Sequence, residues 1–97
     1  MAAQTDVLSI YKNASGNLGT SGRCRIKGFI IVPGGTAGSV VIRDGTVGGR
    51  VIMQTDTLAA STGVSTGLAL VPGEGMLSLA DPYVVLTNVV SITVFYG

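Results

Sequence analysis

Residues 39–56, Ser-Val-Val-Ile-Arg-Asp-Gly-Thr-Val-Gly-Gly-Arg-Val-Ile-Met-Gln-Thr-Asp, form the stretch that decides the fold. Two apolar, β-branched runs, Val40–Ile42 and Val51–Met53, flank a polar segment rich in glycine. Glycine has no Cβ, so it adopts the positive φ angles that tight hairpin turns require. The segment therefore predicts a β-hairpin whose turn is built by Asp44, Gly45, Gly48 and Gly49.

The same alternation of apolar runs with Gly, Pro, Asn or Asp continues outward from this hairpin in both directions. It predicts further strands at Val7–Lys12, Arg23–Val32, Leu68–Val71, Met76–Leu79, Tyr83–Thr87 and Val89–Tyr96. About eight short strands between Gly/Pro turns are typical of an all-β fold. We therefore expect antiparallel strands in a two-sheet β-sandwich, arranged like a jelly roll.

Three connections are less regular. The segment from residue 13 to 22 is rich in Asn, Ser and Gly and is expected to be a loop. The segment from 55 to 67 holds too many Thr, Ser and Gly residues for a helix. The last two strands are expected to pair with each other across Asn88, with the final strand central in its sheet.

The composition predicts association between copies of the chain. The 97 residues suit one domain, 1–97, in which the polar segment 1–6 is expected to be a flexible arm. Hydrophobic residues make up 46%, charged residues only 11%, and the net charge is +1. A domain this small leaves much of its apolar surface outside the core. Burial of that surface in a homo-oligomer is the expected outcome.

The sequence has no uninterrupted apolar stretch of the ~20 residues that a membrane helix needs, and no secretory signal is visible at its start. No membrane association is expected. Cys24 is the only cysteine, which fits folding in a reducing cytoplasm. Because it falls within an expected strand, we interpret it as a buried structural thiol.

Residues that carry chemistry are scarce. The chain has no histidine, the commonest general base. Its five carboxylates stand beside Gly, Thr or Pro, where Asp typically caps backbone N–H groups rather than binding a metal. No glycine-rich segment matches a phosphate-binding loop. We therefore expect no catalytic residue, no metal site, no cofactor and no enzymatic activity.

Arg23, Arg25 and Lys27 form the main basic cluster, and their spacing places them on one face of a strand. They are candidates for contact with a partner protein. The alternative is that they form the solvated face of an edge strand. Nucleic-acid binding is not expected, because three cations with a single nearby aromatic residue, Phe29, would contribute little affinity for a nucleic acid.

Several segments together resemble small β-sandwich virion proteins of tailed bacteriophages, including head decoration or cement proteins. These segments are Ile26–Ile31, Val40–Gly45 with Gly48-Gly49, Gly75–Leu77, Tyr83–Thr87 and Val90–Gly97. The resemblance implies a non-enzymatic virion protein, assembled in the host cytoplasm. It implies a homo-oligomer, with a trimer favoured where capsomers meet, that binds the major capsid protein or other virion subunits.

Two alternatives remain open. The first is a component of a phage tail, fibre or baseplate. A carbohydrate-binding or cell-surface-binding β-sandwich module is the other alternative, although such sites usually present Trp or Tyr, and this chain has no Trp and three Tyr.

Overall fold

The computed structural model describes residues 7–20, 22–59, 68–70, 73 and 75–97. These residues contain nine β-strands and no helix. The expected arm at 1–6 and most of the expected turn before residue 68 lie outside these residues. The strands are β1 (Leu8–Lys12), β2 (Gly16–Asn17), β3 (Cys24–Pro33), β4 (Gly38–Arg43), β5 (Val51–Thr57), β6 (Leu68–Leu70), β7 (Met76–Ser78), β8 (Tyr83–Thr87) and β9 (Val89–Tyr96). The all-β prediction is confirmed.

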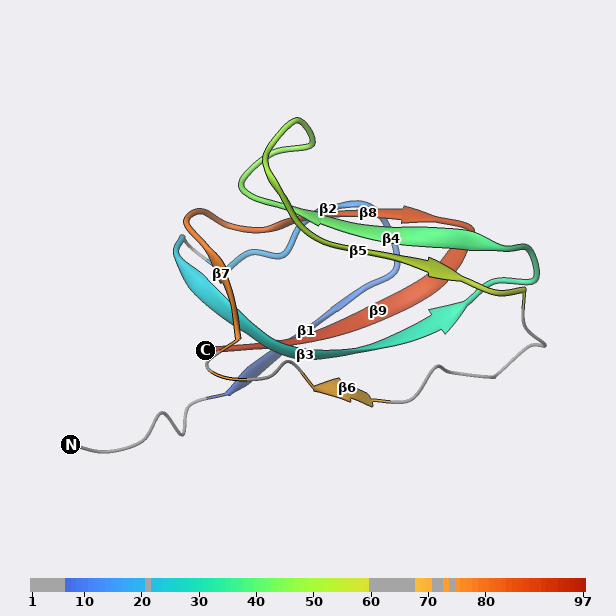
Figure 1. Cartoon of the computed structure of the whole chain (residues 1–97), viewed down its shortest axis with the longest axis horizontal. Coiled ribbons are helices and arrows are strands. Elements are labelled where there is room, and N and C mark those ends of the chain that lie inside the picture. Colours follow the sequence, from blue (N-terminus) through green and yellow to red (C-terminus); the bar gives the residue numbers. More distant parts are fainter. Residues whose placement is uncertain (1–6, 21, 60–67, 71–72, 74) are drawn as a thin grey trace.

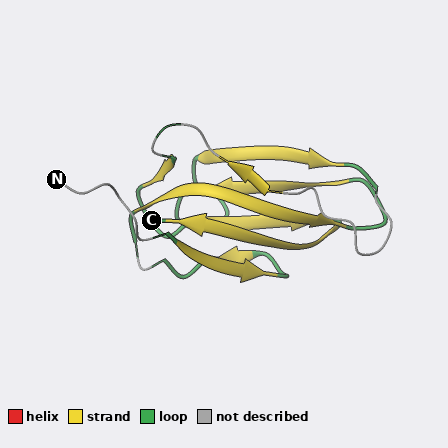
Figure 2. Cartoon of the chain, turned by 90° about the horizontal axis from the view of Figure 1, so that it is seen from below, coloured by secondary structure: helices red, strands yellow, loops and turns green. Residues whose placement is uncertain are grey.

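The strands form two antiparallel sheets that pack face to face (Figure 1). One sheet has the order β1-β9-β3-β6, and β7 pairs with the other part of β3. The second sheet has the order β2-β8-β4-β5. Figure 2 shows the strands running along the length of the molecule. The predicted two-sheet sandwich is therefore present, and β9 lies inside its sheet as expected.

The pairing is nested around the hairpin that the sequence singles out. β4 pairs with β5, β3 with β6 and β7, β2 with β8, and β1 with β9. The chain is thus one long antiparallel hairpin, with β4 and β5 at its closed end. Additional pairing of β3 with β9 and of β4 with β8 rolls this hairpin into two sheets. Such a rolled hairpin is a jelly roll, in agreement with the expectation.

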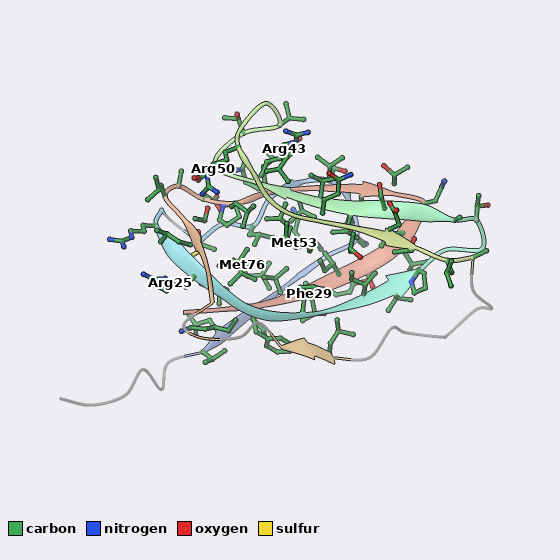
Figure 3. The ribbon with its side chains drawn as sticks, viewed as in Figure 1. Arg25, Phe29, Arg43, Arg50, Met53 and Met76 are labelled. Carbon is green, nitrogen blue, oxygen red and sulfur yellow. The ribbon has the colours of Figure 1, made fainter. Side chains whose placement is uncertain are left out.

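The core lies between the two sheets and consists of branched aliphatic side chains. Their alternation along each strand puts one apolar row on the inner face. The buried cluster comprises Leu18, Ile26, Ile31, Val40, Ile42, Val84, Ile92 and Val94. Phe29, Met53 and Met76 pack against this cluster from its margin (Figure 3).

An irregularity in β3 changes which of its side chains face the core. Ile26 pairs with Tyr96 but Gly28 pairs with Phe95, so Lys27 is an extra residue in the ladder. Such a β-bulge shifts the alternation of side chains by one position. Ile26 is buried before the bulge and Ile31 after it. Each half of β3 therefore sends an apolar row into the core despite the change of phase.

Two expectations about connections are wrong. The segment expected to be a loop contains β2, in which Gly16 and Asn17 pair with Val84 and Tyr83. Such a short strand exists because β8 offers it a free edge, which a local sequence pattern does not reveal. The last two strands do not pair with each other, because β8 and β9 belong to different sheets.

Asn88 makes the corner between these two sheets. Its φ of 53° lies in the left-handed region, which Asn tolerates better than most residues. Its carbonyl accepts a hydrogen bond from Gly34 N at 3.0 Å, and its side-chain Nδ2 donates to Ala37 O at 3.1 Å. These bonds fix the corner against the connection from β3 to β4.

Candidate functional site

Three connections meet at the end of the sandwich where β4 ends, and we call them the loop cluster: residues 17–20, 44–50 and 78–82. Leu18 N donates to Pro82 O at 3.0 Å. Asn17 Nδ2 donates to Gly45 O at 2.9 Å and to Asp81 O at 3.1 Å. One amide side chain therefore ties the first connection to both of the others.

Asp44 clamps the second connection to the third. Its Oδ1 accepts hydrogen bonds from Ala80 N at 2.9 Å and from the Ser78 hydroxyl at 3.1 Å. Its Oδ2 accepts from Leu79 N at 3.2 Å and lies 3.5 Å from Arg50 Nη2. Both carboxylate oxygens are thus used in holding the backbone of residues 78–80 against the hairpin turn.

The ionisation of Asp44 follows from this geometry. Partial desolvation acts to raise the pKa of Asp44. The N–H groups of Ala80 and Leu79, the Ser78 hydroxyl and the Arg50 guanidinium outweigh it and hold the pKa below the ordinary value of an aspartate. Asp44 is therefore a carboxylate at neutral pH and acts as a structural acceptor.

Asp81 holds the first connection, residues 17–20, against the third by accepting hydrogen bonds in the same way. Its Oδ1 accepts from Gly19 N at 2.9 Å and from Thr20 N at 3.1 Å. Gly19 N also lies 3.1 Å from Oδ2. Two carboxylates of the chain, which the sequence places in turns, are therefore both capped by backbone N–H groups from another segment. The sequence predicted capping but not the long-range donors.

The four predicted turn residues have different tasks. Gly45 has a φ of +82°, as the positive-φ prediction requires. Gly49 is needed for another reason, since a Cβ there would lie 1.9 Å from Asp44 O. A Cβ on Gly48 would meet nothing within 4 Å, so no steric reason requires glycine there. The turn is closed by Asp44 N donating to Arg50 O at 2.8 Å.

Cys24 is buried, and its thiol lies next to Thr20 of the loop cluster. Burial raises the pKa of the Cys24 thiol, while a hydrogen bond with Thr20 lowers it and the charges of Asp81 and Asp44 raise it; the net effect is a raised pKa. The thiol stays protonated at neutral pH, and its nucleophilicity is low. This environment agrees with the interpretation of Cys24 as structural.

The structure places the basic cluster of the sequence beside these connections. Arg23 is exposed just before β3, while Arg25 and Lys27 are half-buried within it. Arg50 joins them from the other sheet, because its Nη2 lies 3.3 Å from the carbonyl of Leu77, which pairs with Arg25. Figure 3 shows Arg25, Arg43 and Arg50 toward the same end of the molecule.

The sequence did not link Arg50 to this group. Its position in the expected hairpin turn carries no information on β7, which reaches it only through the pairing of β7 with β3. Arg43, also near the turn, donates from Nη1 to Gly49 O at 3.0 Å and so supports the turn itself. Arg50 of the second sheet therefore lies beside the pair formed by Leu77 and Arg25.

The polar groups of the loop cluster are mainly used in holding the three connections together. Within the described ranges, no three His, Cys, Asp or Glu side chains come together to hold a metal ion. Nor does any helix long and apolar enough to cross a membrane occur in that part of the chain. The chain matches no family model, no curated protein and no solved structure.

We predict that Asp44→Asn lowers the melting temperature at pH 7. The amide keeps one acceptor oxygen but turns an NH₂ group toward the N–H of Leu79 or Ala80, so two donors face each other. Thermal unfolding followed by circular dichroism measures this change. The matched control is Asp56→Asn on β5, whose side chain is exposed and makes no hydrogen bond or ion pair within the described residues. It leaves the melting temperature unchanged.

The same bonds predict an acid dependence. Because the folded-state pKa of Asp44 is depressed, its contribution to stability is complete above the unfolded pKa of about 4. It is lost as the pH falls below that value through the folded pKa. The melting temperature of Asp44→Asn should therefore vary less than that of the wild type between about pH 5 and pH 2. Parallel curves for the two proteins would contradict the role given to Asp44.

Proposed function

We propose that the protein is a non-enzymatic structural protein of a tailed-phage virion. Within that class, we propose a decoration or cement protein that binds the head as a homo-oligomer. One observation carries the proposal: large apolar side chains stand exposed around a sandwich with few charges. They are Val7, Leu8, Tyr11, Val47, Val51, Leu58, Leu79 and Val90. Where such side chains lie together, the surface that they form usually marks contact with other proteins.

The exposed apolar side chains are concentrated at the two rims of the sandwich. Val7, Leu8 and Tyr11 lie on or beside β1, one edge strand of the first sheet. Val51 and Leu58 lie at the start and just beyond the end of β5, one edge strand of the second sheet. Contact between rims of neighbouring copies removes this surface from water and covers edges that otherwise invite irregular pairing.

A cement role follows from mass action. A subunit that binds only the assembled shell stabilises the shell by RT ln(1 + [L]/Kd) per site, without any chemical step. Bridging between capsomers strengthens this effect, since the bound oligomer contacts several of them at once. A folded domain without catalytic activity is sufficient to stabilise the shell, provided that its oligomer binds several capsomers. A trimer is the favoured state at a site where capsomers meet.

The first test measures association of the isolated protein. We expect sedimentation velocity at micromolar concentration to show a multimer, and Leu8→Asp or Val51→Asp to shift it toward monomer. Val90→Asp, at the corner between the sheets, is the matched control and leaves the multimer intact. A wild-type protein that sediments as a monomer would contradict the homo-oligomer.

The second test locates the protein in virions of the phage that encodes it. DNA-filled heads are separated from tails, and each fraction is probed for the protein. We expect the protein on heads, in a fixed ratio to the major capsid protein. Recovery from tails alone would replace the head proposal by a tail component, and absence from both would reject a virion role.

A further inference from the structure

Two strands that end a sheet have a long free edge. β1 has five residues and ends the first sheet, and β5 has seven residues and ends the second. Among the described residues, no backbone hydrogen bond reaches either strand outside its ladder with β9 or β4. Alternate N–H and C=O groups of each strand therefore point away from the sheet, where another extended strand can bind them.

The other edges in the described part of the chain are short or already closed. β2 has only two residues, and beyond it the N–H of Leu86 on β8 donates to the Ser15 hydroxyl at 2.9 Å. β6 and β7 have three residues each, and both pair with β3. β1 and β5 are therefore the two described edges that offer more than three residues to an added strand.

The β1 edge lacks most of the devices that protect edges from pairing. Its residues pair with β9 without a register shift, and it contains no proline. Its one charge is Lys12 at its last position, and Lys12 makes no ion pair with a described residue. Val7, Leu8 and Tyr11 are exposed beside or on this edge. Such an edge is open to another strand.

The β5 edge is regular in its second part. A bulge between the pairs of Ile42 and Arg43 makes Ile52 an extra residue near the start of β5. The pairing is regular from Met53 to Thr57. This part contains Asp56, whose side chain is exposed and makes no hydrogen bond or ion pair with a described residue. One free edge thus ends in a cation without an ionic partner, and the other ends close to an acid without one.

We propose that β1 of one copy adds to the free edge of β5 of a second copy, in parallel, with Lys12 beside Asp56. This inference rests on the proposed homo-oligomer and names the strands that join its copies. A contact between two different strands is heterologous, so its repetition gives a ring or a filament. The trimer favoured above is the ring of three copies, in which no β1 or β5 edge stays free.

Charge complementarity selects both the occupant and the register. A second copy brings an acid to Lys12 through β5, whereas two β1 edges that meet bring none. The parallel register also sets Tyr11 beside Thr55, and aromatic and β-branched neighbours stabilise a sheet. An antiparallel register with Lys12 beside Asp56 runs past the end of β5 after Thr57. The remaining acids Asp6 and Glu74 lie outside the described residues, and the pairing uses neither.

The central test reverses the two charges singly and together. Lys12→Glu and Asp56→Lys each set like charges side by side, and we expect each to weaken association about tenfold in sedimentation velocity. The variant with both changes restores opposite charges in exchanged order, and its association should return to within about twofold of the wild type. Reversal is required because neutralising one member of an exposed pair has little effect.

Arg23→Glu is the matched control for Lys12→Glu. It makes the same change of net charge on an exposed residue that lies outside both edge strands. We expect it to associate as the wild type does. Thermal unfolding of each variant shows that a weaker association is not caused by loss of the fold.

A disulfide tests the register without any change of charge. In the proposed pairing, Tyr11 and Thr55 of two copies lie side by side on adjacent strands, about 4.8 Å apart, which is within the reach of a disulfide. Oxidation of the variant Tyr11→Cys with Thr55→Cys should give covalent multimers on a non-reducing denaturing gel. The matched control, Tyr11→Cys with Gln54→Cys, directs the thiols to opposite faces of the sheet and stays monomeric on the gel. An alkylating agent in the gel buffer prevents exchange with the buried Cys24.

The outcomes separate this pairing from the proposed homo-oligomer. If the wild type sediments as a monomer, both are rejected. If the wild type is a multimer but the double reversal stays as weak as the single ones, the pairing is wrong and the homo-oligomer stands. The same conclusion follows if Arg23→Glu weakens association as much as Lys12→Glu. Cross-linking by both cysteine variants, or by neither, also rejects the pairing.

Discussion

Gly49→Ala lowers the free energy of unfolding by about 3 kcal/mol, near the upper end of what over-packing usually costs. The added Cβ would lie 1.9 Å from Asp44 O and 2.9 Å from Asp44 C, and both are backbone atoms. No side-chain rotation relieves that overlap, so the hairpin turn must open. Opening it also loosens the carboxylate of Asp44, which holds residues 78–80.

Gly48→Ala is the matched control for this prediction. It adds the same methyl group to the neighbouring residue, where nothing lies within 4 Å and φ is not in the left-handed region. Its effect should be within about 0.5 kcal/mol of zero or slightly stabilising, since alanine restricts the unfolded chain. Urea unfolding measures both variants. Equal midpoints for Gly48→Ala and Gly49→Ala would show that the turn has another conformation.

Ile42→Ala lowers the free energy of unfolding by about 2–5 kcal/mol. Ile42 is fully buried near the end of β4, where it pairs with Met53 on one side and Val84 on the other. Truncation removes buried apolar surface and leaves a cavity between two sheets that cannot move together without breaking their ladders. In so small a domain this loss is comparable with the total stability.

Val41→Ala provides the comparison for the core. Val41 is the preceding residue of the same strand, and it is half-buried on the outer face. Its truncation opens no internal cavity, so the loss should be clearly smaller than for Ile42→Ala. Denaturant unfolding with equal m-values for the two variants would confirm that only stability differs. Equal losses would mean that the outer face of β4 is covered as completely as the inner one.

The sequence predicted much of the architecture because strand signals in this chain are local. The apolar runs around the Asp44–Gly49 turn, the proline after Val32 and the alternation in the last strand all act within a few residues. They are sufficient to place eight of the nine strands to within a few residues, all except β2, together with the central position of β9. The two-sheet class follows from the number and the length of those strands.

What the sequence missed depends on contacts between distant segments. β2 exists only through its pairing with β8, and the bulge at Lys27 only through its ladder with β9. An expected pairing across Asn88 failed because a single residue in the left-handed region is sufficient to send the chain to the other sheet. Each of these is decided by tertiary structure and not by propensity.

The candidate site shows the same division. Arg23, Arg25 and Lys27 were recognised as basic, but their combination with Arg50 required the position of β7. The sequence also did not show that β1 and β5 keep free edges, because an edge depends on which strands pair. It is therefore visible only in three dimensions.

The nested pairing has a consequence for the order in which the protein folds. Among the described strands, β3 pairs only with β6, β7 and β9, all of which are synthesised later. Its apolar segment therefore leaves the ribosome without a partner and waits while β4 and β5 close their local hairpin. Long-range closure of this kind is slow, and waiting strands are prone to aggregate. Synthesis at high level therefore sets folding of β3 in competition with its association with other nascent chains.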